Sequence, residues 1–185
     1  MIEHLLPTHR FIPYDVLPSV KAIDLNALKS SGFKGVIFDV DNTLIPYDDR
    51  AVKPWHQALF TELERLGLKT MMLTNNHHQD VKDFADACGI DVILSANKPL
   101  KRGYQKALKR LNLKPSETMM VGDQFMTDLY GASKVGMPTI LVPPIKRKSE
   151  KWYTKLLRRL ERAMKEKVTR AHPELTSKLI EIHDA

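Results

Sequence analysis

Short apolar runs recur along the middle of the chain, and a polar cluster follows each of the first four. Apolar runs that stop at turn residues are typical of buried strands. The expected strands cover 34–38, 68–73, 91–94, 118–121 and 138–142. Segments with apolar residues at helical spacing lie between them. Strands that alternate with helices predict an α/β fold in which helices cover both faces of a doubly wound parallel sheet.

The expected helices begin and end at recognisable signals. Pro54 fits the first turn of a helix, and Gly67, Gly89 and Gly136 stand where three helices should stop. The expected helices cover 24–30, 54–66, 79–88, 101–111 and 127–135. A length of 185 residues suits a single domain. We expect its parts to be an N-terminal extension, a catalytic core and a basic helical extension, at 1–31, 32–143 and 144–185.

Reactive side chains follow the expected strands. Asp39 and Asp41 come directly after the first run, where alternation places them on the same side. Ligands bind at the carboxyl ends of strands in open α/β sheets. The later clusters contribute Thr74, Lys98, Asp123 and Asp128. Each alone is most often a cap, loop or turn residue. Together, and in this order, they predict one catalytic site.

With these residues the sequence resembles the haloacid dehalogenase (HAD) superfamily of aspartate-nucleophile phosphatases. The motifs match as Asp39-Val40-Asp41-Asn42-Thr43, Thr74, Lys98, and Gly122-Asp123 with Asp128. A smaller match, at 19–24, Thr74-Asn75-Asn76 and Gly122-Asp123-Gln124, resembles the YqeG subfamily of class IIIA. The resemblance implies a HAD-type, Rossmann-like fold.

The resemblance also implies roles for these residues. Asp39 would attack phosphorus and form an aspartyl-phosphate, while Asp41 would move the proton. Thr74 and Lys98 would bind the oxygens of the transferring group. Mg²⁺ would be bound by Asp39, the Asp41 backbone carbonyl, Asp123 and Asp128. The residues expected to support these catalytic and metal-binding groups, or to contact the substrate, are Asn42, Thr43, Asn75 and Gln124.

The spacing of the motifs predicts a capless site. About 23 residues separate Leu44 from Leu68, and an inserted domain with its own core would need on the order of 50. The site should therefore be open, which suits a bulky substrate such as a lipid headgroup or a macromolecule. A partner subunit could also close it. The sequence does not predict the oligomeric state.

Positive charge is concentrated near the C-terminus. The net charge is +7, and 146–170 contains 11 Lys and Arg against 3 Glu. Apolar residues at four-residue steps, from Trp152 to Val168, predict a basic amphipathic helix. Its apolar stripe could pack on the domain, its basic face could lie on an anionic membrane, or it could bind RNA. The scarcity of aromatic residues makes nucleic acid the weaker alternative.

Other features favour a soluble enzyme. The only cysteine, Cys88, excludes an internal disulfide and is expected to be an inert, buried thiol. The adjacent His77 and His78 cannot share a helix face, so we do not expect a zinc site. The sequence shows no signal peptide and no run long enough to cross a bilayer. We expect a cytoplasmic protein. If the basic helix lies on a membrane, the contact would be peripheral and at the inner face.

The expected function is that of a Mg²⁺-dependent phosphomonoesterase. YqeG-like proteins resemble mitochondrial phosphatidylglycerophosphate phosphatases, so that phospholipid is the leading substrate. One alternative is a phosphatase of soluble phosphosugars or nucleotides. Another, from a different class, is an RNA- or ribosome-associated assembly factor with slight phosphatase activity.

Overall fold

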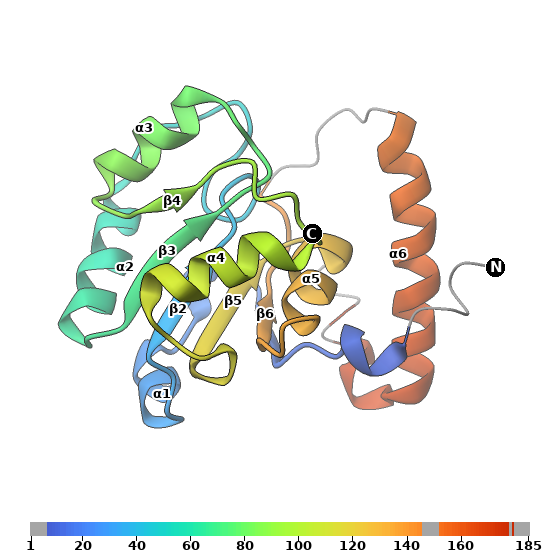
Figure 1. Cartoon of the computed structure of the whole chain (residues 1–185). Coiled ribbons are helices and arrows are strands. Elements are labelled where there is room, and N and C mark those ends of the chain that lie inside the picture. The colour runs from blue at the N-terminus through green and yellow to red at the C-terminus, as the bar shows by residue number, and fades with distance from the viewer. Residues whose placement is uncertain (1–6, 146–151, 178, 180–185) are drawn as a thin grey trace.

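A parallel sheet of six strands forms the centre of the computed structural model, which describes residues 7–145, 152–177 and 179 (Figure 1). The spatial order is β1-β6-β5-β2-β3-β4, and every neighbouring pair is parallel. The strands are β1 (Asp15–Val16), β2 (Gly35–Phe38), β3 (Lys69–Leu73), β4 (Val92–Ile93), β5 (Thr118–Gly122) and β6 (Thr139–Leu141). All five expected strands are present, although the third and the fifth are each two residues shorter than expected.

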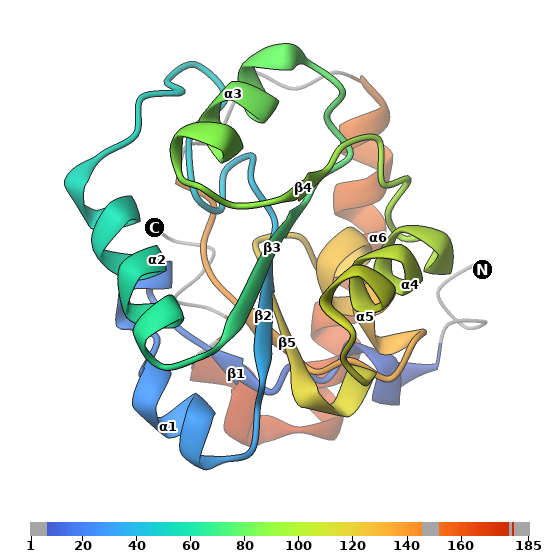
Figure 2. The same ribbon diagram turned by 60° about the vertical axis from the view of Figure 1, so that its left-hand side comes forward.

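Helices cover both faces of this sheet (Figures 1 and 2). They are α1 (Leu25–Ser30), α2 (Pro54–Arg65), α3 (Gln79–Ala87), α4 (Lys101–Leu111), α5 (Tyr130–Ser133) and α6 (Trp152–Ala171). Successive side chains of β2 point to opposite faces of the sheet and contribute to two hydrophobic cores. Phe38 packs in one core with Phe60 of α2, and Ile37 packs in the other with Tyr104 of α4. The predicted doubly wound α/β fold is therefore confirmed.

The first strand was not predicted. Residues 15–16 pair with β6, and backbone bonds on either side, such as Leu17 N–H to the Leu141 carbonyl at 2.9 Å, extend the pairing. Two residues are too few for an alternating pattern, and Pro13 and Pro18 on either side look like loop signals. The N-terminal segment thus adds an edge strand to the sheet.

The helix expected at 127–135 has a different form. A π-helical turn at Phe125–Leu129 precedes the short α5. Widened turns of this kind are frequent at functional sites. Here the turn contains Asp128, which the site uses.

The basic amphipathic helix is present as α6. Met164 and Val168 are fully buried against Phe11, Phe125 and Leu141. Packing of the apolar stripe on the domain is thus shown for its C-terminal half. The side chains of its N-terminal half, which include Trp152, Leu156 and Leu160, lie outside the described residues. None of the described helices combines the length and apolar character that crossing a bilayer requires.

The connections at the catalytic edge are short. Between β2 and β3 the chain forms one loop and α2, and between β3 and β4 it forms α3. These connections agree with the predicted capless architecture. Cys88, directly after α3, is half-buried, whereas full burial was expected. Burial raises the pKa of its thiol to about 11, which agrees with an inert cysteine.

Candidate active site

The strand register brings the predicted residues to one edge of the sheet. Phe38 of β2 pairs with Met72 of β3 and with Val121 of β5. Asp39, Thr74 and Asp123 therefore emerge side by side where these three central strands end.

A buried lysine connects two of the carboxylates. Lys98 Nζ lies 2.5 Å from Asp39 Oδ1 and 2.7 Å from Asp128 Oδ1. Asn75 fixes the lysine's backbone, since its Oδ1 accepts from Lys98 N–H at 2.6 Å and its Nδ2 donates to the Lys98 carbonyl at 3.0 Å. The loop after β4 thus positions the Lys98 ammonium at the ends of the strands.

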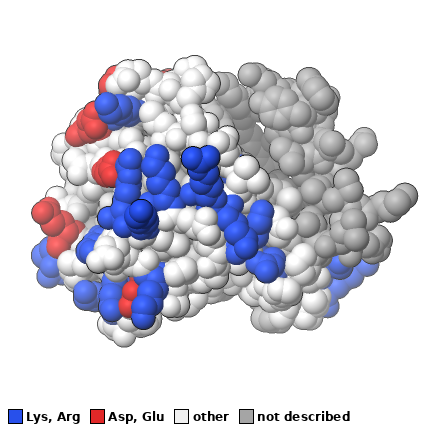
Figure 3. All heavy atoms as spheres, in the orientation of Figure 1, with Lys and Arg blue, Asp and Glu red and all other residues white. Residues whose placement is uncertain are grey.

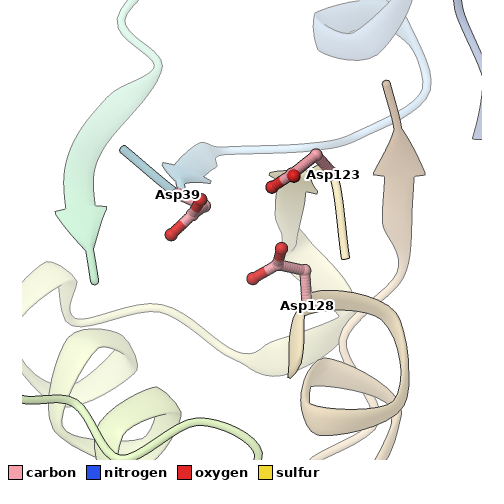
Figure 4. Close-up of side chains that lie close together, drawn as sticks. All are labelled: Asp39, Asp123 and Asp128. Atoms are coloured by element: carbon pink, nitrogen blue, oxygen red, sulfur yellow. The ribbon is translucent and has the colours of Figure 1, made fainter. Parts of the chain in front are cut away.

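Thr43 connects Asp39 to the next carboxylate. Its hydroxyl lies 3.2 Å from Asp39 Oδ2 and 3.1 Å from Asp123 Oδ1. One oxygen from each of Asp39, Asp123 and Asp128 lies within 4.8 Å of the others. Figure 4 shows the three carboxyl groups turned toward a shared space.

Asp128 reaches this space because residue 122 is glycine. A Cβ on Gly122 would lie 2.3–2.6 Å from atoms of the Asp128 side chain, far inside van der Waals contact. Gln124 N–H donates to Asp128 Oδ2 at 3.0 Å, and the Gln124 side chain accepts from Thr127. The turn after β5 is therefore shaped around this carboxylate.

Burial and mutual repulsion perturb the cluster. Burial, only partly offset by Lys98, raises the pKa of Asp39 to about 7. Burial and the charges of Asp39 and Asp128 raise the pKa of Asp123 well above its usual value. Burial alone would lower the pKa of Lys98, but Asp128 and Asp39 outweigh it and the pKa is raised. The excess of negative charge favours a bound cation.

The donor set fits Mg²⁺. Carboxylate oxygens are hard ligands, and octahedral Mg²⁺ with ~2.1 Å bonds places opposite ligands ~4.2 Å apart. The three carboxylate oxygens lie within 4.8 Å of one another, which is close to this distance between opposite ligands. Near these carboxylates, the side-chain oxygen of Asn42 is buried and has no hydrogen-bond partner among the residues that the structure describes. Asp39, Asp123 and Asp128 are thus the candidate metal ligands among the described residues.

Asp41 has different partners. Its carboxylate accepts from Arg50 at 2.6 Å, from Thr74 Oγ1 at 3.2 Å and from Asn76 Nδ2 at 3.1 Å. Arg50 also bonds to Asp80 at 3.1 Å. The loop between β2 and α2 therefore returns over the site and contacts the second predicted catalytic aspartate.

Two residues of this loop were not predicted from the sequence. Arg50 follows no strand and belongs to none of the motifs, and its contact with Asp41 depends on the path of the loop. Tyr47 is the second. Partial burial and the nearby carboxylates of Asp41 and Asp123 raise the pKa of this partly exposed tyrosine to about 12.

The structure brings most of the predicted residues together, but it divides them into two groups. Asp39, Thr43, Lys98, Asp123 and Asp128 form one hydrogen-bonded cluster. Thr74 belongs to the second group, because its hydroxyl donates to Asp41 and not to the cluster. The catalytic roles of these residues stay predictions.

Comparison with known proteins agrees with this geometry. Residues 47–136 match the family model of haloacid dehalogenase-like hydrolases. A probable phosphatase, YqeG of Bacillus subtilis (strain 168), is 33% identical over 152 residues, or 82% of this chain and 88% of that protein. The chloroplastic phosphatidylglycerophosphate phosphatase 1 of Chlamydomonas reinhardtii is 30% identical over 159 residues, or 81% of this chain. The match spans only 59% of that algal protein.

Solved structures show the same fold. NagD from E. coli K-12 superimposes with a TM-score of 0.52 at 16% identity, covering 63% of this chain and 90% of that one. The α/β sheet and the sequence match over most of YqeG define the class, and the chain belongs to the haloacid dehalogenase-like hydrolase family. Within that family it is a phosphatase.

Proposed function

We propose that the protein is a Mg²⁺-dependent phosphomonoesterase that works through an aspartyl-phosphate on Asp39, with phosphatidylglycerophosphate as its substrate. The observation that carries the proposal is the buried cluster in which Lys98 contacts both Asp39 and Asp128 beside Asp123. A carboxylate held at a strand end by an ammonium is poised to meet a phosphate dianion.

The first chemical step belongs to Asp39. A carboxylate oxygen attacks phosphorus, an Asp39 O–P bond forms, and the bond from phosphorus to the leaving oxygen breaks. Lys98 donates to the phosphoryl oxygens as negative charge builds on them. Because Asn75 bonds to the Lys98 backbone on both sides, the ammonium is already in place.

Asp41 moves the proton. In its protonated form it gives its proton to the leaving alkoxide and becomes a carboxylate. The carboxylate then takes a proton from the water that attacks phosphorus in the aspartyl-phosphate, which frees phosphate, regenerates Asp39 and returns Asp41 to its protonated form. Asp41 is surrounded by Arg50, Thr74 and Asn76, so its orientation is fixed by three donors. Thr74 can also turn its hydroxyl toward a bound phosphate.

Asp39, Asp123 and Asp128 would hold Mg²⁺, with the Asp41 backbone carbonyl as the fourth protein ligand. Bound there, the ion supplies positive charge that offsets repulsion between the nucleophile and the phosphate. Thr43 orients two of the carboxylates by bonding to Asp39 and Asp123. Asn42 and Gln124 complete the surroundings of the strand ends.

The choice of substrate rests on two supports. The short connections leave the catalytic edge uncapped, which admits a phosphomonoester carried on a large lipid. The similarity to a phosphatidylglycerophosphate phosphatase over 81% of this chain favours that lipid. The proposed setting is the inner face of the membrane, reached from the cytoplasm.

A hydrolysis screen tests the proposal. Purified protein with Mg²⁺ is given phosphatidylglycerophosphate in detergent micelles, phosphosugars, nucleotides and an aryl phosphate. We expect kcat/KM to be highest for phosphatidylglycerophosphate. A higher value for a phosphosugar or nucleotide would replace the lipid with a soluble substrate. Slight activity on every compound, with tight binding to RNA, would favour the assembly-factor alternative.

A further inference from the structure

A hollow lies beside the loop that carries Lys98, between β4 and the start of α4. Its volume is about 380 Å³, and its wall combines apolar side chains of Ile93, Leu94 and Leu100 with the cations Arg102 and Lys106. Leu100 is 59% exposed, which is unusual for a large apolar side chain. A surface of this mixed character fits an amphiphile with an anionic head.

The hollow is continuous with a basic helix face. The exposed residues of α4 are Lys101, Arg102, Gln105, Lys106, Lys109 and Arg110. Five of these six are cations, and α4 contains no acidic residue. Only Arg110 has an acidic partner in the described chain, Asp91 at 3.0 Å. Figure 3 shows the Lys and Arg side chains gathered in a band over α4.

The hollow and the catalytic site are both lined by the loop after β4. Residues 95–97 line the hollow, and the next residue, Lys98, contacts Asp39. Gly103 lets α4 lie close against this loop, because a Cβ there would be 2.5 Å from the Ala96 carbonyl oxygen. A headgroup that meets the start of α4 is therefore adjacent to the reacting edge of the sheet.

We propose that this hollow and the basic face of α4 form the docking surface for an anionic phospholipid bilayer. The inference rests on the proposed function and specifies how the site meets its lipid. Arg102 and Lys106 bind lipid phosphates, and Leu100 enters the boundary between headgroups and acyl chains. Docking through α4 brings the open catalytic edge to the membrane surface.

Two observations favour a bilayer at α4 over the alternatives. Neither the described lining of the hollow nor the exposed face of α4 offers an aromatic side chain on which a base could stack, since Tyr104 is fully buried. On α6, Met164 and Val168 are already used in packing on the domain, so they are not available to enter lipid.

Two charge-matched double variants of the full chain test the surface. Arg102→Gln with Lys106→Gln removes two cations from α4. Arg162→Gln with Arg170→Gln removes two exposed cations from α6 and leaves the same net charge. Co-sedimentation is measured with vesicles of phosphatidylcholine and phosphatidylglycerol, and competition is measured with RNA at the same ionic strength. Hydrolysis of an aryl phosphate reports on the catalytic site.

We expect the α4 variant to bind the vesicles at least tenfold more weakly, since each basic residue near an anionic surface adds measurably to binding. The α6 variant should bind like wild type, and both should keep aryl-phosphate hydrolysis. Leu100→Ser should weaken vesicle binding without changing charge. Wild-type binding by the α4 variant, equal losses in both variants, or preference for RNA over vesicles would each overturn the proposal.

The outcomes separate this inference from the proposed function. If phosphatidylglycerophosphate in detergent micelles is not hydrolysed, the substrate is wrong whatever the vesicles show. If it is hydrolysed in micelles and the α4 variant also hydrolyses it at the wild-type rate in vesicles, the substrate stands and the docking surface is wrong.

Discussion

Replacement of Lys98 with methionine tests the electrostatics of the cluster, because methionine keeps the bulk of the side chain and removes its charge. The ammonium lies 2.5 Å from Asp39 and 2.7 Å from Asp128, and all three residues are buried. Lys98→Met therefore leaves buried carboxylates without their cation. It should also abolish turnover, since the ammonium contacts the proposed nucleophile.

Removing one partner of a buried ion pair costs about 3–5 kcal/mol. In a domain of this size 1 kcal/mol corresponds to ~2–4 °C in Tm, so without metal the variant should melt about 6–20 °C below wild type. Asp39 limits the loss by taking up a proton, because its pKa is already raised to about 7. A raised pKa in the folded state means that stability falls as pH rises through that pKa. The deficit should therefore be larger at alkaline pH.

Scanning calorimetry in chelator, across this pH range, gives the measurement. The control is the double variant Asp39→Asn with Lys98→Met, in which one of the repelling carboxylates is neutral. It should melt above Lys98→Met, with the coupling expected of residues in contact. If Lys98→Met melts within a degree of wild type in chelator, or the double variant gives no recovery, the account of the cluster is wrong.

Three further changes probe other parts of the site. Gly122→Ala should displace the Asp128 carboxylate and lower kcat by roughly 100-fold, with Tm and KM as the companion measurements; normal kcat would contradict the close approach. Asp123→Ala should lose most activity and regain part of it at high Mg²⁺. If the variant depends on Mg²⁺ as the wild type does, Asp123 is not a metal ligand. Because of His56, the free energy of unfolding of the protein should decrease as the pH falls below about 6.5. Burial lowers its pKa in the folded state, and one ring nitrogen accepts from Lys53 N–H while the other contacts the Leu44 carbonyl, so protonation favours unfolding. His56→Gln should flatten the dependence of Tm on pH, and an unchanged slope would contradict this assignment.

The residues that could be predicted are those set by local pattern. Asp39, Thr74 and Asp123 directly follow apolar runs, and parallel pairing of β2, β3 and β5 is enough to place them together. Lys98 could be assigned from its position after the third run. Its two carboxylate partners, however, depend on the loop that Asn75 holds.

The remaining features depend on tertiary structure. Arg50 reaches Asp41 only because the loop before α2 folds back over the strand ends, and no periodicity encodes that path. The π-helical turn at Phe125–Leu129 contains Asp128, whose side chain lies against the backbone of Gly122, and the sequence pattern does not show this contact. Strand β1 is too short to have a pattern.

Asp39 is the residue proposed to carry the phosphoryl group. Wild-type protein with Mg²⁺ and a reactive aryl phosphate is quenched in acid within the first turnovers, and the peptide that contains Asp39 is analysed by mass spectrometry. We expect a phosphate on Asp39 that disappears as turnover ends, and no phosphate in a folded, inactive Asp39→Asn variant. Turnover by folded Asp39→Asn at more than a few per cent of the wild-type rate, or phosphate on another residue, would contradict it.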